Sequence, residues 1–181
     1  KCLKICAACV IVNVAGLFVA QKFNLPIYFD TYGTVFIAAL GGYVPGIAVG
    51  FFTNLFGSML SISKMYFSIV NILIAIITAF LCQRGYYEKF SKVLLTIPLT
   101  VLVASLVGTL IEELIYRKIL IESLWNFLLD FNEQFFNELP DKCLAILIAF
   151  FLIKKVPDDL RKKFLLLGKM QAPLSSEIRR E

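Results

Sequence analysis

Six apolar runs, separated by charged residues or by proline and glycine, dominate the pattern of hydrophobic and polar positions along the chain. They cover residues 3–20, 28–42, 45–62, 66–82, 93–111 and 143–153. A membrane-spanning helix needs about 20 mainly apolar residues, and flanking residues can lengthen the shorter runs. The sixth run becomes long enough if its helix begins near Pro140 and ends near Val156. The pattern predicts an all-α integral membrane bundle of about six transmembrane helices.

Lysine and arginine residues are unevenly divided between the segments that connect these runs. If the N-terminus lies inside, the inner segments hold thirteen of the 18 basic residues and the outer segments hold five. Basic residues accumulate on the cytoplasmic side of short loops. We therefore expect a multi-pass protein of the plasma membrane with both termini in the cytoplasm. The net charge of +5 is explained by this orientation and does not indicate nucleic-acid binding.

A more polar stretch, residues 112–141, separates the fifth run from the sixth. It is too polar to span a membrane, but apolar residues such as Ile115, Ile119, Phe127 and Phe131 recur at about helical spacing. We predict one or two amphipathic helices across the outer mouth of the bundle. They form either a plain structural cap or a lid over a binding cavity.

Composition supports one membrane domain. The chain has 181 residues, of which 59% are hydrophobic and 17% charged. Soluble domains have about 45–50% apolar and about 25% charged residues. We expect residues 1–157 to form the membrane domain and residues 158–181 to form a cytoplasmic juxtamembrane tail or linker, which leaves room for a further domain.

The chain has no histidine, which removes the commonest general base and metal ligand. Glu112, Glu113 and Arg117 match the EExxxR element of the CAAX-type intramembrane proteases, but those enzymes also need histidines. We therefore expect no enzymatic activity, no cofactor and no metal. Cys2, Cys6 and Cys9 share one helical stripe, which suits either a soft metal or simple packing.

Small residues at four-residue spacing indicate close helix packing. Gly42, Gly46 and Gly50 form two overlapping GxxxG spacings, and Asn54 follows four residues later. Such spacings place bare backbone on one helix face and allow a second helix to approach. We assign these four residues to helix packing.

Several polar side chains fall within or beside the apolar runs. Asp30 opens the second run, whereas Asn13 and Asn71 lie inside the first and fourth. A polar group in hydrocarbon needs a partner and often marks a ligand path. Asp30 is either a helix N-cap or part of such a path. The asparagines form helix-to-helix hydrogen bonds or face a ligand.

The stretch LPIYFDTYGTVFIAALGGYVPGIAVGFFTNLFG, residues 25–57, resembles the second and third helices of the substrate-binding S components of energy-coupling factor (ECF) vitamin transporters. The six predicted helices, the chain length and the late ELPDKCLAILIAF helix fit the same family. The resemblance implies a small bundle that captures a vitamin-sized molecule near its outer face. Its first three helices would associate with a transmembrane coupling subunit driven by two ATPases.

Carried over by position, the resemblance nominates eight residues for the ligand pocket: Tyr28, Asp30, Tyr66, Asn71, Glu113, Tyr116, Glu138 and Lys142. The small residues expected on the docking face of the first helix are approximated by Ala7, Ala15, Gly16 and Ala20. The implied partners are a small molecule, the lipid bilayer and the coupling proteins. The acidic outer residues favour a cationic or hydrogen-bond-donating ligand.

A second use of such a domain is also implied. S-component-like domains resemble the N-terminal membrane inputs of some bacterial signalling proteins, and VPDDLRKKFLLLGKMQAPLSSEIRRE looks like a connector to a phosphatase, kinase or cyclase. Ligand capture outside would then shift the sixth helix and change the output inside. Uptake and sensing both remain open at this point.

Overall fold

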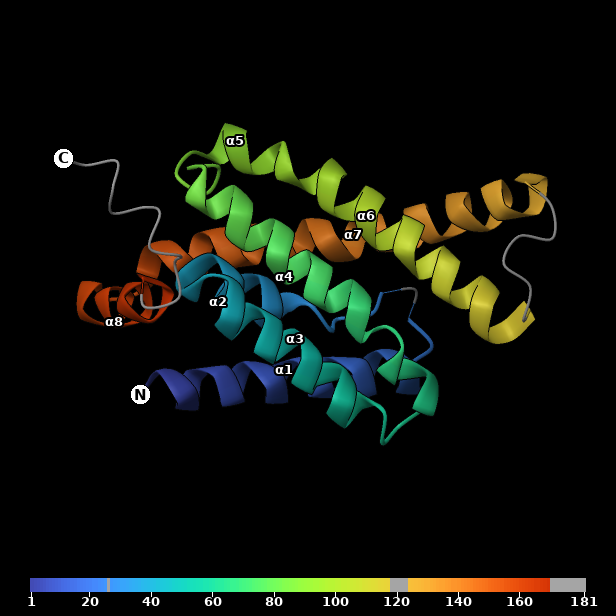
Figure 1. Ribbon diagram of the computed structural model, residues 1–181, viewed down its shortest axis with the longest axis horizontal. Helices are drawn as coiled ribbons and strands as arrows, with labels where there is room; N and C mark the ends of the chain where they lie inside the picture. The colour runs from blue at the N-terminus through green and yellow to red at the C-terminus, as the bar shows by residue number, and fades with distance from the viewer. Residues whose placement is uncertain (26, 118–123, 170–181) are drawn as a thin grey trace.

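The computed structural model describes residues 1–25, 27–117 and 124–169, and every regular element in these ranges is helical (Figure 1). The elements are α1 (Cys2–Lys22), α2 (Tyr32–Gly41), α3 (Tyr43–Gly57), the short 3-10 helix η1 (Ile62–Met65), α4 (Ser68–Gln83), α5 (Phe90–Leu94), α6 (Thr96–Glu112), the π-helical turn η2 (Glu113–Arg117), α7 (Leu124–Lys155) and α8 (Asp158–Lys169). The predicted all-α class is confirmed.

Among the residues that the structure describes, three helical segments are long and apolar enough to cross a membrane: Cys2–Lys22, Ile62–Gln83 and Phe90–Ile115. The helices α2 and α3 are apolar but have only 10 and 15 residues. At about 1.5 Å per residue they are shorter than the ~30 Å hydrocarbon layer. By length and composition the structure therefore supports three spans, and the count of six stays a prediction.

Gly42 does not pack on a helix face, which corrects the predicted run of three packing glycines. It lies between α2 and α3 with φ +81° and ψ −159°, and a Cβ added there would meet nothing within 4 Å. Glycine adopts this backbone conformation without the steric cost that other residues would meet. Gly42 therefore ends α2 and turns the chain into α3.

The other packing residues lie in α3. A Cβ added at Gly46 would lie 2.6 Å from the Cβ of Ala38 in α2, and one at Gly50 would lie 3.1 Å from the backbone oxygen of Asn71 in α4. The buried Asn54 side chain donates a hydrogen bond to the Gly50 oxygen at 3.1 Å. Gly46 and Gly50 thus let α3 approach two different helices.

Asn13 fastens α1 to its two neighbours. Its Nδ2 donates to Thr34 Oγ1 of α2 and to Thr53 Oγ1 of α3, each at 3.1 Å, and its Oδ1 accepts from the Gly33 amide at 2.7 Å. All these groups are buried, and each needs its partner because no water competes for it. Of the two roles considered for Asn13, the helix-to-helix hydrogen bond is the one observed.

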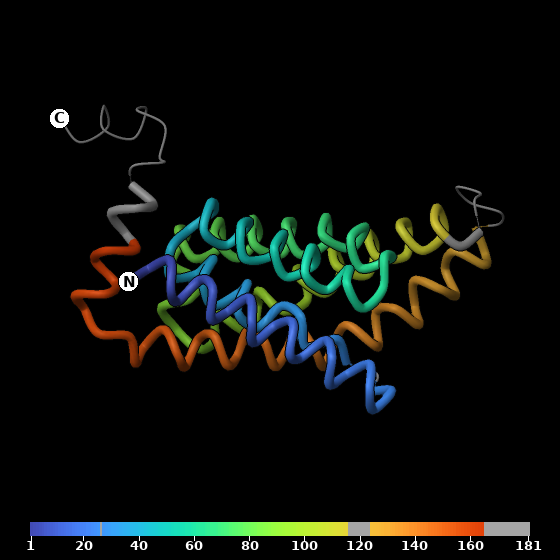
Figure 2. Tube along the Cα trace, turned by 90° about the horizontal axis from the view of Figure 1, so that it is seen from below, coloured from blue at the N-terminus to red at the C-terminus, as the bar shows by residue number. Residues whose placement is uncertain are grey.

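The helix α7 corrects the expected division between an outer amphipathic segment and a sixth helix. It is one continuous element of 32 residues that includes Pro140, so it is about 48 Å long. Figure 2 shows that its N-terminal half runs in a different direction from its C-terminal half. The sixth helix was predicted to begin near Pro140, but α7 continues through this residue, and the charged residues beside it, Glu138, Asp141 and Lys142, are buried and paired with one another.

The start of the predicted tail is also helical. In α8, Phe164 is fully buried in an apolar cluster with Val10, Ile37, Leu40 and Val49. A Cβ added at Gly41 would lie 2.8 Å from the Phe164 ring. Packing therefore extends beyond residue 157, and the rest of the predicted tail, residues 170–181, lies outside the described residues.

Candidate ligand-binding cavities

The segment that leads into α2 is tied to two distant helices. The Phe29 amide donates to Asp141 Oδ1 of α7 at 3.0 Å, and Phe29 has φ +56°, an uncommon value for a bulky residue. Its backbone lies against Gly16 of α1, where a Cβ would come within 2.5 Å of the Phe29 oxygen. These contacts hold the neighbouring Tyr28 and Asp30 beside α4 and α7.

Lys142 of α7 is the centre of a buried charge cluster. Its Nζ lies 2.7 Å from Asp141 Oδ2, 2.8 Å from Glu138 Oε2 and 3.8 Å from Asp30 Oδ1. The lysine side chain is 2% exposed and that of Asp141 is 0% exposed. Buried charges persist only when they are paired, and here three carboxyl groups surround one ammonium.

Asp30 and Asn71 form the edge of this cluster. Asn71 Nδ2 donates to Asp30 Oδ2 at 3.1 Å. Within the described residues, neither Asp30 Oδ1 nor Asn71 Oδ1 has a hydrogen-bond partner, although both atoms are buried. The N-cap position of α2 belongs to Thr31, so Asp30 does not cap the helix. Two acceptor atoms are therefore left without donors.

A cavity of about 110 Å³, which we call the lysine cavity, lies against these groups. Its wall also carries the Tyr28 ring, whose hydroxyl donates to Gln134 Oε1 at 3.4 Å, and Lys64, whose Nζ lies 5.5 Å from the centre of that ring. The lining residues are Tyr28, Asp30, Ser63, Lys64, Phe67, Val70, Asn71, Glu112, Gln134, Glu138 and Lys142.

A second cavity of about 300 Å³, the acidic cavity, shares Tyr28, Glu112 and Gln134 with the lysine cavity. Its remaining lining residues are Thr109, Glu113, Asp130, Glu133 and Asn137. The combined volume of the two cavities falls within the usual range for small-molecule binding sites, which starts at about 300 Å³. The shared residues make them two parts of one polar region.

The structure gathers most of the eight residues nominated for the pocket. Five of them line the lysine cavity, namely Tyr28, Asp30, Asn71, Glu138 and Lys142. Glu113 lines the acidic cavity instead. Tyr66 is 52% exposed and lines neither cavity. The Tyr116 side chain lies outside the described residues. Ligand binding by these residues stays a prediction.

Several residues of the site were not foreseen from the sequence, namely the lining residues Gln134, Lys64, Glu112 and Glu133, and Asp141, which lies beside Lys142. One signal was available, because Asp130, Gln134, Glu138 and Lys142 follow one another at four-residue spacing. Residues four apart share one face of a helix. This polar stripe on α7 was hidden by the expectation that a helix break occurs near Pro140.

Burial changes the acidity of this region. Burial raises the pKa of Glu138 above its ordinary value, and the nearby Lys142 only partly opposes the rise. Burial likewise raises the pKa of Asp30, again opposed by Lys142. Burial and the neighbouring Glu138 raise the pKa of Tyr28 to about 12. The cluster thus favours an additional proton or cation.

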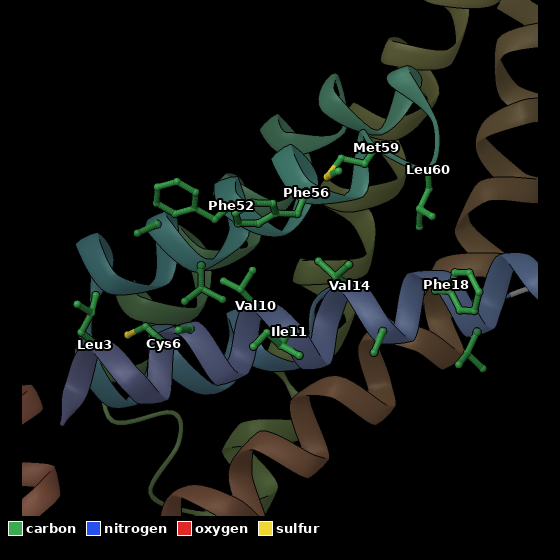
Figure 3. Close-up of a pocket in the computed structure, with 15 residues that line it drawn as sticks. Leu3, Cys6, Val10, Ile11, Val14, Phe18, Phe52, Phe56, Met59 and Leu60 are labelled. Atoms are coloured by element: carbon green, nitrogen blue, oxygen red, sulfur yellow. The ribbon is translucent and has the colours of Figure 1, made fainter.

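A larger hollow of about 970 Å³, the apolar groove, runs between α1 and α3 (Figure 3). Figure 3 shows apolar side chains such as Phe18, Phe52 and Phe56 along it. It offers no polar group to orient a polar ligand, as a specific small-molecule site does. Its lining residues are Leu3, Cys6, Ala7, Val10, Ile11, Val14, Ala15, Phe18, Val19, Ala48, Val49, Phe52, Phe56, Met59 and Leu60.

The cysteine stripe of α1 divides between two environments. Cys6 lines the apolar groove, whereas Cys9 lies against Gly33 of α2. Within the described part of the chain, no group of three cysteine, aspartate or glutamate residues is arranged to hold a metal ion. The observed contacts of Cys6 and Cys9 are those of small packing residues.

Comparisons with known proteins return no matching family model, no matching curated protein and no matching solved structure.

Proposed function

We propose that this chain is a membrane-embedded domain that binds a vitamin-sized molecule, as the S components of ECF-type uptake transporters do. The observation that carries the proposal is the pair of adjoining polar cavities, built by the segment before α2 together with α4, α6 and α7. Polar groups inside a membrane bundle are costly and are usually functional. A few convergent polar groups in a buried cavity are typical of a ligand site.

In this proposal the chain crosses the bilayer six times and both termini are cytoplasmic. The three long apolar segments supply three of the crossings, and α2, α3 and the C-terminal half of α7 supply the others. Charged and polar residues gather at the N-terminal half of α7, while Lys154 and Lys155 end the same helix. The positive-inside rule then puts the cavities toward the outer face.

The apolar groove fits the proposed contact with a transmembrane coupling subunit. It lies on α1 and α3, two of the three helices that the family resemblance assigns to docking. Of the small residues expected on the docking face, Ala7 and Ala15 line the groove. Gly16 instead lies against Phe29, and Ala20 is buried. The docking surface proposed here therefore includes only two of the four small residues that the sequence implied.

A specific observation also favours the sensing alternative. Glu138 and Lys142 near the middle of α7 contact the cavity cluster, and the same helix leads through Pro157 into α8. In α8, Phe164 packs against Gly41 of α2. If α7 can take two positions and the ligand has a higher affinity for one of them, ligand binding would shift α7 to that position and move α8 with it. Such a shift is the input that an attached signalling domain would need.

Mass spectrometry of small molecules released from the detergent-purified chain tests the binding proposal. We expect the wild type to retain a vitamin-sized molecule, and Asp30→Ala and Asn71→Ala to lose it. Asp158→Ala, an exposed position in α8, is the matched control and retains it. Equal retention by both cavity variants and the wild type would contradict the assignment of the site.

Uptake and sensing are separated by the proteins that accompany the chain. Co-purification of a coupling subunit and ATPases from native membranes supports uptake. A native reading frame that continues into a phosphatase, kinase or cyclase domain supports sensing and removes the uptake proposal.

A further inference from the structure

We infer that the molecule bound in these cavities carries a protonated amine, which binds between Asp30 Oδ1 and Asn71 Oδ1. The inference rests on the proposed function and names the chemical class of its ligand. It starts from two of the buried acceptor atoms that lack hydrogen-bond partners in the described residues, and both belong to residues lining the lysine cavity.

Lys142 does not satisfy Asp30. Its ammonium lies 2.7 and 2.8 Å from Asp141 and Glu138, but 3.8 Å from Asp30, beyond hydrogen-bond distance. A buried carboxylate oxygen that lacks a hydrogen bond, as Asp30 Oδ1 does, is costly, and a charged donor compensates it best. Asp30 therefore has room for a second cation.

The orientation of the Asn71 amide is set by Asp30. Asn71 Nδ2 donates to Asp30 Oδ2. If the Asn71 amide were flipped, its oxygen would face the Asp30 carboxylate and this hydrogen bond would be lost. Asn71 is 1% exposed, so its remaining oxygen cannot rely on bulk water. An ammonium group has three donors and no acceptor, so one group can donate to both Asp30 and Asn71. An anionic group can donate to neither.

The surrounding charges favour the same class of ligand. The described residues that line the two cavities include six carboxyl groups and two lysines. One of these lysines, Lys142, is held by Asp141 and Glu138. The other, Lys64, lies over the face of the Tyr28 ring. Lys142 Nζ also lies 6.0 Å from the centre of this ring, so the Tyr28 ring already faces two cations, as aromatic rings commonly do at such distances.

Three probes of similar shape and different charge test the inference: phenethylamine, 2-phenylethanol and 3-phenylpropionate, which are cationic, neutral and anionic near pH 7. Each is added at millimolar concentration to the detergent-purified full chain, and binding is measured from the shift in the unfolding temperature. We expect the amine to bind at least about tenfold more tightly than the alcohol, as one charge-assisted hydrogen bond allows.

Asp30→Asn is the decisive variant because it keeps the shape of the side chain and can still accept from Asn71. We expect it to weaken phenethylamine binding about tenfold and to leave 2-phenylethanol nearly unchanged. Asp158→Asn in α8 makes the same chemical change at an exposed site and has no effect. The wild-type comparison of the three probes does not depend on whether Asp30→Asn folds.

The outcomes separate this inference from the function on which it rests. Equal or tighter binding of the neutral or anionic probe overturns the amine assignment while leaving a ligand site in place. Binding of none of the three probes also overturns it, and the retained-molecule experiment then decides the proposed function by itself. A retained molecule without an amine would overturn the assignment alone.

Discussion

The apolar groove and the pair of polar cavities differ in how they are built. The apolar groove is larger, at about 970 Å³, but it is lined by only α1, α3 and the residues that follow α3. The polar cavities are smaller and draw their walls from the segment before α2, η1, α4, α6, η2 and α7. Contact with lipid or with a partner helix is enough to explain apolar side chains on the face of a membrane helix. Buried charges are costly in such a bundle and are usually functional, so the polar cavities are the better evidence of function.

The largest expected effect comes from removing the Lys142 ammonium at the centre of the polar cluster. Lys142→Met leaves Asp141, Glu138 and Asp30 without their buried counter-ion. Breaking a buried ion pair typically costs about 3–5 kcal/mol of unfolding free energy. Unfolding of the purified chain in mixed detergent micelles measures this loss.

The groove supplies the contrast to that variant. Phe52→Ala truncates a large side chain of the groove. Because Phe52 is 44% exposed, we expect the free energy of unfolding to fall by less than about 1 kcal/mol. Adding Asp141→Asn to Lys142→Met should recover part of the lost stability, because one unpaired charge is then removed. Equal losses in the two single variants would erase the energetic distinction between the regions.

Two neighbouring positions of α1 sharpen the comparison. Gly16→Leu would force a side chain against Phe29, where a Cβ alone comes within 2.5 Å of a backbone oxygen. We expect a loss of about 1–3 kcal/mol in the free energy of unfolding, together with loss of the retained molecule. Ala15→Leu lines the groove and should change stability by less than about 0.5 kcal/mol. Thermal unfolding and ligand retention of both variants provide the measurements.

Filling the groove should affect partners more than folding. Ala7→Phe places a large side chain among the groove residues, and we expect stability to change by less than about 0.5 kcal/mol. Binding of phenethylamine should stay as in the wild type, while co-purification of a coupling subunit declines. A variant that lost the probe instead would show that the two regions are not independent.

The smallest effect is the dependence of stability on pH. Burial raises the pKa of Asp30 and Glu138, so the folded state binds more protons than the unfolded state between the ordinary and the raised values. Stability of the ligand-free protein then rises as the pH falls through this interval, from the raised pKa values toward the ordinary ones. Asp141, Lys142 and Lys64 face the same cluster and set its charge.

Unfolding temperatures across this range, compared between the wild type and Asp30→Asn, measure the pH effect. The variant should show the flatter profile because it lacks one of the two groups. An unchanged slope would remove Asp30 as its source.

The residues differ in how far the sequence could predict them. Asn71 was foreseen as a polar residue within an apolar run, and Glu138 and Lys142 were implied by the family resemblance; all three line the lysine cavity. Asp141 was not, although its carboxylate contacts both Lys142 and the Phe29 amide. Its partner Phe29 lies 112 residues away in the chain, and no local pattern predicts such a contact. Gly42 was misassigned because glycine suits both a packing face and a turn.

The sequence by itself determined the helical class and the apolar segments, because hydropathy and helical period are properties of neighbouring residues. Only the tertiary structure decided that α7 runs unbroken through Pro140 and that α8 packs on α2. It also decided which carboxylates Lys142 contacts. A charge inside an apolar bundle is stable only beside its partner, and that partner is chosen by how distant helices pack.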